Sequence, residues 1–507
     1  MSELRKTSIF VGVALVLMGL VAVSGLVGRA STDASREIGL PLFPNFVSPE
    51  QATTLQVADF DAETGQAFPF EVTLKDGRWV IPSHYNYPAD ARDRLAKTAA
   101  GVIDLVRDTY RGNNAADHRA MGVLDPLSGD VSSAEGLGKR VTMKDASGQV
   151  LADLIVGSPI EGQPDQRYAR LPSENAVYGV RLGDLDLSPR FTDWIETDLL
   201  KLTPSGVREV VFQKFSFDAA SGELKGKPIT AHKADVTQLA PGAPAWTIDQ
   251  EVPPGREVNA TALDTLVSTL AGLRILGVRP KPPNLSADLK AGDGSIQMDP
   301  ATLNSLRALG FVILDGVLVS KEGSVYIACD DGVVYNLHFG TMTYGRGSAL
   351  TSGKRGDEVK EALEKPAGVA ENENFIESRY LFVLVRHSPE LIEKPKSREP
   401  GELPDDVFAR EKFEREAMNQ RAEQEAKAKQ ANYDRKLEEG RKRAKELRER
   451  FAGWYYIVPG DSFRKVVLDP SVLTRVKSAQ PPNGMPGQFP GGFPGGRPNL
   501  PGFPPGQ

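Results

Sequence analysis

Residues 77–91 read GRWVIPSHYNYPADA, and residues 244–260 read PAWTIDQEVPPGREVNA. Each stretch has a tryptophan, one further residue and an isoleucine, and each then runs through a polar segment with proline into a helical pattern. A shift of 168 residues superposes the apolar stripes of the two patterns, placing Leu95 on Leu263 and Val102 on Leu270. Apolar residues three or four positions apart indicate a helix with one buried face. We infer that the chain contains the same structural unit twice.

The two tryptophans, Trp79 and Trp246, can be interpreted in two ways. In a duplicated fold, each lies on the strand before a helix and packs beneath that helix as ordinary core. Alternatively, both line a site where a ligand stacks on them. The repeated surroundings favour the core interpretation.

The segments around each helical pattern alternate between apolar and polar residues, which indicates strands. In the first half, two strands meet at the turn Asp76-Gly77, and two hairpins follow the helix within residues 140–156 and 168–180. The second half repeats this order. We predict an α+β fold with two duplicated strand–helix–β-meander units, at residues 44–205 and 206–478, after an N-terminal transmembrane helix.

The N-terminus contains the predicted membrane anchor, within residues 1–30. Ser8 to Gly28 carries no charge, and a helix of about 20 apolar residues crosses a bilayer. Arg5 and Lys6 precede this stretch, so we expect the N-terminus in the cytoplasm and the bulk of the chain in the periplasm, at a bacterial inner membrane. A cleaved signal peptide is the alternative, although its apolar region is usually about 7–15 residues long.

Residues 404–451 form a charged insertion in the second unit. They are rich in Ala, Glu, Lys, Gln and Arg, which are strong helix formers. Leu437, Ala444 and Phe451 are seven residues apart, but Gln430 and Glu423 interrupt the series, so the coiled-coil signal is weak. A glycine at Gly440 could divide the helix into two. The sequence predicts either a solvated surface helix or a partner-binding arm, grafted into a hairpin that is short in the first unit.

The C-terminal residues 479–507 are a Pro/Gly-rich tail of low complexity. Such a composition cannot bury a core, and we expect the tail to be disordered.

Composition and charge exclude several classes of protein. The net charge of -6 argues against a nucleic-acid partner, which would require a basic face. Cys329 is the one cysteine of the chain, so no intramolecular disulfide or cysteine-based metal site can form. It follows an apolar run, which predicts a buried thiol.

The sequence contains no catalytic constellation, so we assign no catalytic, cofactor-binding or metal-binding residues. The five histidines are far apart and none has metal-ligand spacing with an acid: His84, His118, His232, His338 and His387. Asp330-Asp331-Gly332 fits a turn between strands better than a metal site. The glycine-rich stretch from Gly340 to Gly356, which holds Arg346, Lys354 and Arg355, is predicted to be a long loop, with anion binding as the alternative.

Several short motifs of the first unit resemble a known family. They are Trp79-Val80-Ile81, the helix from Leu95 to Leu105, Gly122-Val123-Leu124-Asp125-Pro126, Gly157 and Tyr168-Ala169-Arg170, together with Pro88. They resemble a bacterial family of membrane-anchored domains of unknown function that is associated with gliding-motility-type ABC transport systems. The resemblance covers roughly Val47 to Leu473, and the arm and the tail depart from it. It implies an auxiliary role and no catalytic residues.

We therefore expect a non-enzymatic, single-pass scaffold or accessory protein whose partners bind the helical arm. The resemblance implies that these partners are subunits of an ABC-type transport complex. An envelope polysaccharide- or peptidoglycan-binding module is the first alternative. It requires an exposed aromatic–polar groove, and full burial of Trp79 and Trp246 would argue against it. A hydrolase is the second, and it requires His338 or His118 beside a serine and an aspartate.

Overall fold

The computed structural model describes residues 37–61, 66–128, 134–183, 185, 187–214, 216–217, 224–235, 239–240, 243–282, 285, 300–314, 317–345, 350–351, 376–395 and 409–477. The predicted anchor Ser8 to Gly28 and the predicted tail lie outside these residues. None of the helices that the structure describes is long and apolar enough to span a bilayer.

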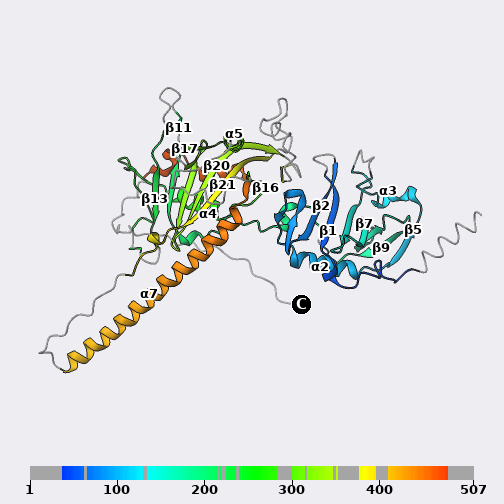
Figure 1. Cartoon of the computed structure of the whole chain (residues 1–507), viewed down its shortest axis with the longest axis horizontal. Helices are drawn as coiled ribbons and strands as arrows, with labels where there is room; N and C mark the ends of the chain where they lie inside the picture. Colours follow the sequence, from blue (N-terminus) through cyan, green and yellow to red (C-terminus); the bar gives the residue numbers. More distant parts are fainter. Residues whose placement is uncertain are drawn as a thin grey trace, which may run out of the picture.

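Two large antiparallel sheets dominate the fold (Figure 1). In spatial order, the first consists of β4 (Tyr87–Pro88), β3 (Arg78–Ile81), β2 (Gln66–Lys75), β1 (Thr54–Asp61), β6 (Lys139–Lys144), β7 (Val150–Ile160), β8 (Gln163–Arg170), β9 (Val177–Arg181) and β5 (Thr109–Gly112). The second consists of β14 (Trp246–Ile248), β13 (Ile229–Lys233), β10 (Val207–Gln213), β19 (Ser324–Cys329), β20 (Val333–Gly345), β21 (Ile376–His387), β22 (Trp454–Pro459) and β16 (Gly277–Pro280).

Helices and small strand pairs complete the described fold. The helices are α2 (Arg92–Ile103), α3 (His118–Met121), α4 (Ala260–Ala271), α5 (Pro300–Ala308), α7 (Ala409–Phe451) and α8 (Gly460–Val466). The two-stranded sheets pair β11 (Ser216–Phe217) with β12 (Leu224–Lys225), β15 (Arg256–Val258) with β23 (Thr474–Val476), and β17 (Phe311–Leu314) with β18 (Val317–Ser320). The predicted α+β class is confirmed.

The strand order confirms the duplication. In both sheets, a three-stranded segment (β3-β2-β1 or β14-β13-β10) adjoins a four-stranded meander (β6 to β9 or β19 to β22). The strand after the helix then closes the sheet, as β5 in one and β16 in the other. Helices α2 and α4 begin and end 168 residues apart, and their buried residues correspond at the same shift: Leu95, Thr98, Ala99 and Val102 in α2, and Leu263, Leu266, Val267 and Leu270 in α4.

A glycine contact is also duplicated. A Cβ atom on Gly157 would lie 2.5 Å from the carbonyl oxygen of Met121, and one on Gly340 would lie 2.4 Å from that of Leu309. Only a residue without a side chain permits this approach of the strand to the turn after the short helix. An arginine of the following strand, Arg167 in β8 or Arg379 in β21, donates through Nη1 to the carbonyl of that glycine at 3.3 Å in both units.

One hydrophobic core extends through both units. The segment after β3 joins them, because the Tyr87 ring lies 4.9 Å from the Trp454 ring of β22, edge to face. The connection between the two sheets is also buried, with Trp194, Leu199 and Leu200 inaccessible to solvent. Tyr87, in the polar half of the first quoted stretch, and the buried connection therefore both join the two units.

Candidate functional site

Helix α7 is the insertion that distinguishes the second unit from the first. It is a single helix of 43 residues between β21 and β22, where the first unit has a short loop between β8 and β9. Figure 1 shows it reaching well beyond the second sheet. The predicted helical arm is confirmed.

Only the C-terminal third of the arm is packed against the body. Gly440, Ala444, Leu447 and Phe451 are buried at spacings of four, three and four residues, and the last three belong to the main core. This spacing places them on one helix face. The seven-residue pattern therefore serves intramolecular packing rather than a coiled coil.

Gly440 does not break the helix, contrary to one possibility raised by the sequence. It is buried against the turn between β19 and β20, where an added Cβ atom would lie 1.9 Å from the Asp331 carbonyl oxygen. Glycine is required here for close approach of the helix, not for flexibility.

Charges fix the arm at the same turn. The Arg443 guanidinium donates to the Asp331 carboxylate at 2.7 Å and to the Tyr335 hydroxyl at 2.9 Å. Nearby, the Lys436 ammonium lies 2.9 Å from the Asp330 carboxylate, which Arg208 also approaches at 3.4 Å. Asp330-Asp331-Gly332 is thus a turn, as predicted, and its carboxylates hold the arm. Among the described residues, no cluster of His, Cys, Asp and Glu could hold a metal ion.

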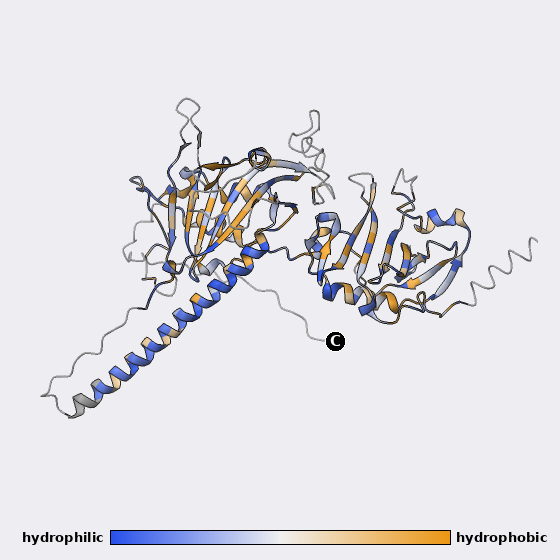
Figure 2. Cartoon of the chain, in the orientation of Figure 1, coloured by the Kyte–Doolittle hydropathy of each residue, from blue (hydrophilic) through white to orange (hydrophobic). Residues whose placement is uncertain are grey.

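The part of α7 that precedes Tyr433 faces solvent: its described side chains are exposed or only partly buried. Figure 2 shows a predominantly hydrophilic helix, and Met418 is 59% exposed. A helix that is polar all round has no apolar face with which to pack on its own domain. This half of α7 is therefore available to another molecule.

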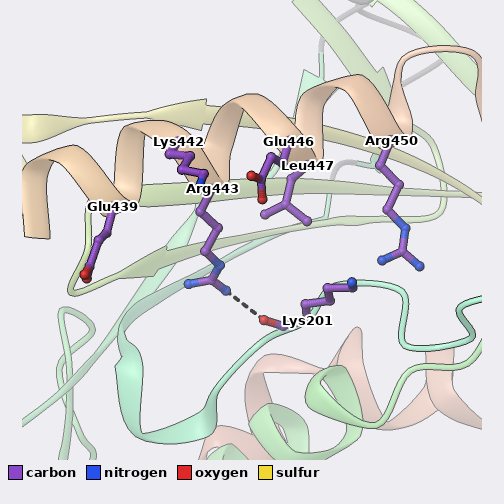
Figure 3. Close-up of a pocket in the computed structure, with 7 residues that line it drawn as sticks. All are labelled: Lys201, Glu439, Lys442, Arg443, Glu446, Leu447 and Arg450. Carbon is purple, nitrogen blue, oxygen red and sulfur yellow. Dashed lines mark hydrogen bonds between the residues drawn. The ribbon is translucent and has the colours of Figure 1, made fainter.

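A pocket lies where the docked third of the arm meets the connection between the sheets (Figure 3). Its volume is about 490 Å³, and its lining residues are Lys201, Glu439, Lys442, Arg443, Glu446, Leu447 and Arg450. Arg443 donates to the Lys201 carbonyl at 2.8 Å and so closes one side. No local pattern in the sequence predicts this pocket, because Lys201 and the arm are far apart in the chain.

The two tryptophans differ in exposure. Trp246 is 1% exposed beneath α4, and its indole N–H donates to the Asp264 carboxylate at 2.9 Å. Trp79 is half-buried at the rim of the same core. Trp246 is therefore a core residue and unavailable to a ligand, whereas Trp79 is only partly buried. The full burial of both tryptophans that would argue against a polysaccharide-binding module is thus found for Trp246 alone.

The hydrolase alternative depended on His338 or His118. The His338 Nδ1 lies 2.8 Å from the Ser324 hydroxyl across β19 and β20, but both residues are 2% exposed and burial lowers the pKa of His338 to about 4. A substrate cannot reach this pair. His118 lies 2.9 Å from the carbonyl oxygen of Asn175, a structural contact. That the protein is not an enzyme stays a prediction.

The glycine-rich stretch from Gly340 is strand rather than loop at its start, because β20 continues to Gly345. Arg346, Lys354 and Arg355 lie outside the described residues. Cys329 is a free, buried thiol, as predicted, and burial raises the pKa of its thiol to about 12.

Comparison with known proteins found one family match. No curated protein matches the chain, and no solved structure matches it. The match begins at Trp79, in the first quoted stretch, and runs through the second stretch and α4, so it includes the junction between the units. It supports the expected type of family and carries no link to transport. The family model described as "Domain of unknown function (DUF4340)" matches residues 79–291 of this chain.

Proposed function

We propose that this protein is a non-enzymatic, single-pass membrane-anchored scaffold or accessory protein that binds a partner through the free part of α7. The observation that carries the proposal is that α7 is docked only through its C-terminal third, while the described side chains before Tyr433 contact mainly solvent. The finer proposal is that the partner belongs to an ABC-type transport complex. It rests on the resemblance of the first unit to a family associated with such systems.

The energetics of the arm support a binding role. An isolated helix needs more than about 12–15 residues to be even marginally stable in water. Packing of Leu447 and Phe451 in the core holds one end, so the free part extends from a helix that has already formed. At 1.5 Å per residue, the stretch from Ala409 to Asn432 is about 35 Å long. A partner meets a preformed helix and does not pay the full ordering entropy on binding.

The positions of Glu37, where the described chain begins, and of the projecting end of α7 support the membrane-anchored geometry that we propose. The described chain begins at Glu37, whose carboxylate accepts a hydrogen bond from Tyr178 in β9 and pairs with Arg107. The predicted anchor precedes this point. In Figure 1, β9 and the projecting end of α7 lie toward opposite ends of the molecule. The proposed anchor and the proposed binding surface are therefore carried by different units. We further propose that the bulk of the chain lies in the periplasm of a bacterial cell, on the N-terminal charges alone.

A photo-crosslinking experiment tests the proposal. A photoreactive residue replaces Gln424, which is exposed on the free part of α7, in the full chain expressed in its native membrane. The matched control replaces Val150 of β7, which is 50% exposed on the first unit. We expect specific adducts from position 424 alone, and adducts that contain transporter subunits support the finer proposal.

A deletion provides the complementary test. Removing Ala409–Lys429 shortens the free part and retains the docked residues from Lys436 to Phe451. In a mild-detergent pull-down read by mass spectrometry, we expect the partner to be lost from this variant. A partner retained at full yield would show that the arm is not its binding surface. Recovery of no other protein from the intact chain would contradict the scaffold role.

A further inference from the structure

The first residues that the structure describes form an exposed apolar turn, residues 37–41, which we call the N-terminal turn. Ile38, Gly39, Leu40 and Pro41 follow one another without a polar side chain, and all of them are exposed. The two large side chains, Ile38 and Leu40, are 47% and 51% exposed. Runs of exposed apolar residues are avoided on the surface of soluble proteins unless they serve a contact.

The body of the first unit holds the N-terminal turn in one conformation. The Leu40 N–H donates to the Glu37 carbonyl at 3.1 Å, and Gly39 has φ 85°, which a turn of this kind requires. The Gly39 N–H donates to the Arg107 carbonyl at 2.8 Å, and the Arg107 N–H donates to the Leu40 carbonyl at 3.0 Å. The Arg107 guanidinium also donates to the Pro41 carbonyl at 2.9 Å. A fixed backbone therefore presents the apolar side chains, and they are not a fraying chain end.

The N-terminal turn presents these side chains without an unpaired charge. Glu37 is the one ionisable residue between positions 37 and 47. Its carboxylate lies 3.2 Å from the Arg107 guanidinium and accepts a hydrogen bond from the Tyr178 hydroxyl at 3.1 Å. Moving a charge out of water is costly unless the charge is paired. The pairing of Glu37 lowers this cost where the turn meets an apolar environment.

The distance along the chain to the predicted anchor identifies the environment that this turn meets. Eight residues, 29–36, separate Gly28 at the end of the predicted anchor from Glu37. Eight extended residues reach at most about 30 Å, so the anchor keeps the turn within that distance of the bilayer. Apolar side chains held at a bilayer surface bind at the boundary between headgroups and acyl chains.

We propose that Ile38 and Leu40 insert into the headgroup region of the bilayer, so that the N-terminal turn is a membrane contact in addition to the anchor. The proposal rests on the membrane anchor of the proposed function and adds a surface that orients the first unit, which a flexible tether alone would leave free to rotate. In Figure 1, β9, which holds Glu37, and the projecting end of α7 lie toward opposite ends of the molecule. The contact would therefore direct the free part of α7 away from the site of insertion.

Fluorescence quenching in bilayers tests the proposal. The full chain, reconstituted in phosphatidylcholine vesicles, carries nitrobenzoxadiazole on the variant Leu40→Cys, and Cys329 is buried and escapes labelling. We expect a quencher attached to the lipid near the acyl carbonyls to lower the emission about twofold, because interfacial side chains lie at this depth. The matched control is Val317→Cys, since Val317 is 42% exposed in β18 of the second unit. Its emission should be unchanged by the quencher.

A second substitution separates insertion of the turn from insertion of the label. Ile38→Asp, added to the labelled Leu40→Cys chain, should reduce quenching to the level of the control, because a carboxylate resists transfer out of water. Ile38 is exposed, so this change leaves the core intact. Equal quenching at positions 40 and 317, or quenching that Ile38→Asp does not reduce, would overturn the proposal. A disulfide between two Leu40→Cys chains without quenching would also overturn it, because it would show a contact between copies.

Extraction with alkaline carbonate distinguishes failure of this proposal from failure of the anchor. A chain that stays in the vesicles while its Leu40 label is unquenched would retain the anchor and refute insertion of the N-terminal turn alone. A chain that is extracted would refute the anchor and, with it, the membrane contact.

Discussion

Gly440 shows how one residue without a side chain positions the arm. In an exposed helix, replacing glycine by alanine stabilises by roughly 1 kcal/mol. At this position, the added Cβ atom would meet a main-chain oxygen 1.9 Å away, so the helix or the turn must shift. We expect Gly440→Ala to lower the free energy of unfolding by about 1–3 kcal/mol, measured by denaturant titration.

The control for this substitution is Gly453→Ala, because a Cβ atom at Gly453 has no heavy atom within 4 Å. We expect its effect to be near zero. Stabilisation by Gly440→Ala would show that the arm is not held against the turn at this point.

Two buried histidines make the stability dependent on pH. Burial lowers the pKa of His338 to about 4, and burial with repulsion from Arg279 lowers that of His84 to about 3. Between these values and about 6.5, the unfolded chain binds protons that the folded chain does not, so the free energy of unfolding falls as the pH falls through this window.

We expect the variant His338→Gln to lose less stability than the unmodified protein when the pH is lowered from 7 to 4.5. The difference should be on the order of 2 kcal/mol, because the variant lacks the titrating imidazole. Denaturant titrations at the two pH values give the measurement, and the carboxylate contribution cancels in the comparison. Identical pH dependence in both proteins would refute the assignment.

At the scale of elements, an ion pair at the β19–β20 turn orients α7. Arg443 and Asp331 have side chains that are 29% and 18% exposed, so solvent screens their interaction only in part. A double-mutant cycle with Arg443→Gln and Asp331→Asn should give a coupling energy of about 1 kcal/mol. The matched pair Arg435 and Glu439, on an exposed face of the same helix and about 60% exposed, should give a few tenths at most. Equal coupling energies would assign no special role to the turn.

At the scale of the whole molecule, the continuous core predicts that the two units unfold together. We expect one calorimetric transition for the protein. Tyr87→Ala removes the ring against Trp454 and should separate the units into two transitions. Tyr110→Ala is the control, because Tyr110 packs on Tyr178 within the first unit. It should lower the midpoint and keep one transition. An unaltered single transition for Tyr87→Ala would indicate that the buried connection alone couples the units.

The sequence by itself determined the repeated unit and the helical arm, because both are recorded in local patterns. The stripes of α2 and α4 repeat at one shift, and the strands of the hairpins alternate, so their periods are readable without a structure. The arm follows from a long run of helix formers without proline.

Only the tertiary structure decided where the arm docks and what surrounds it. The partners of Asp330 and Asp331, Lys436 and Arg443, lie more than a hundred residues further along the chain. The sequence leaves the role of Gly440 open for the same reason: a glycine in a helix has the same local signal whether it breaks the helix or admits a neighbouring turn. The pocket joins Lys201 to α7 by a contact between segments 242 residues apart. Such contacts depend on how the whole chain packs, and no periodic pattern encodes them.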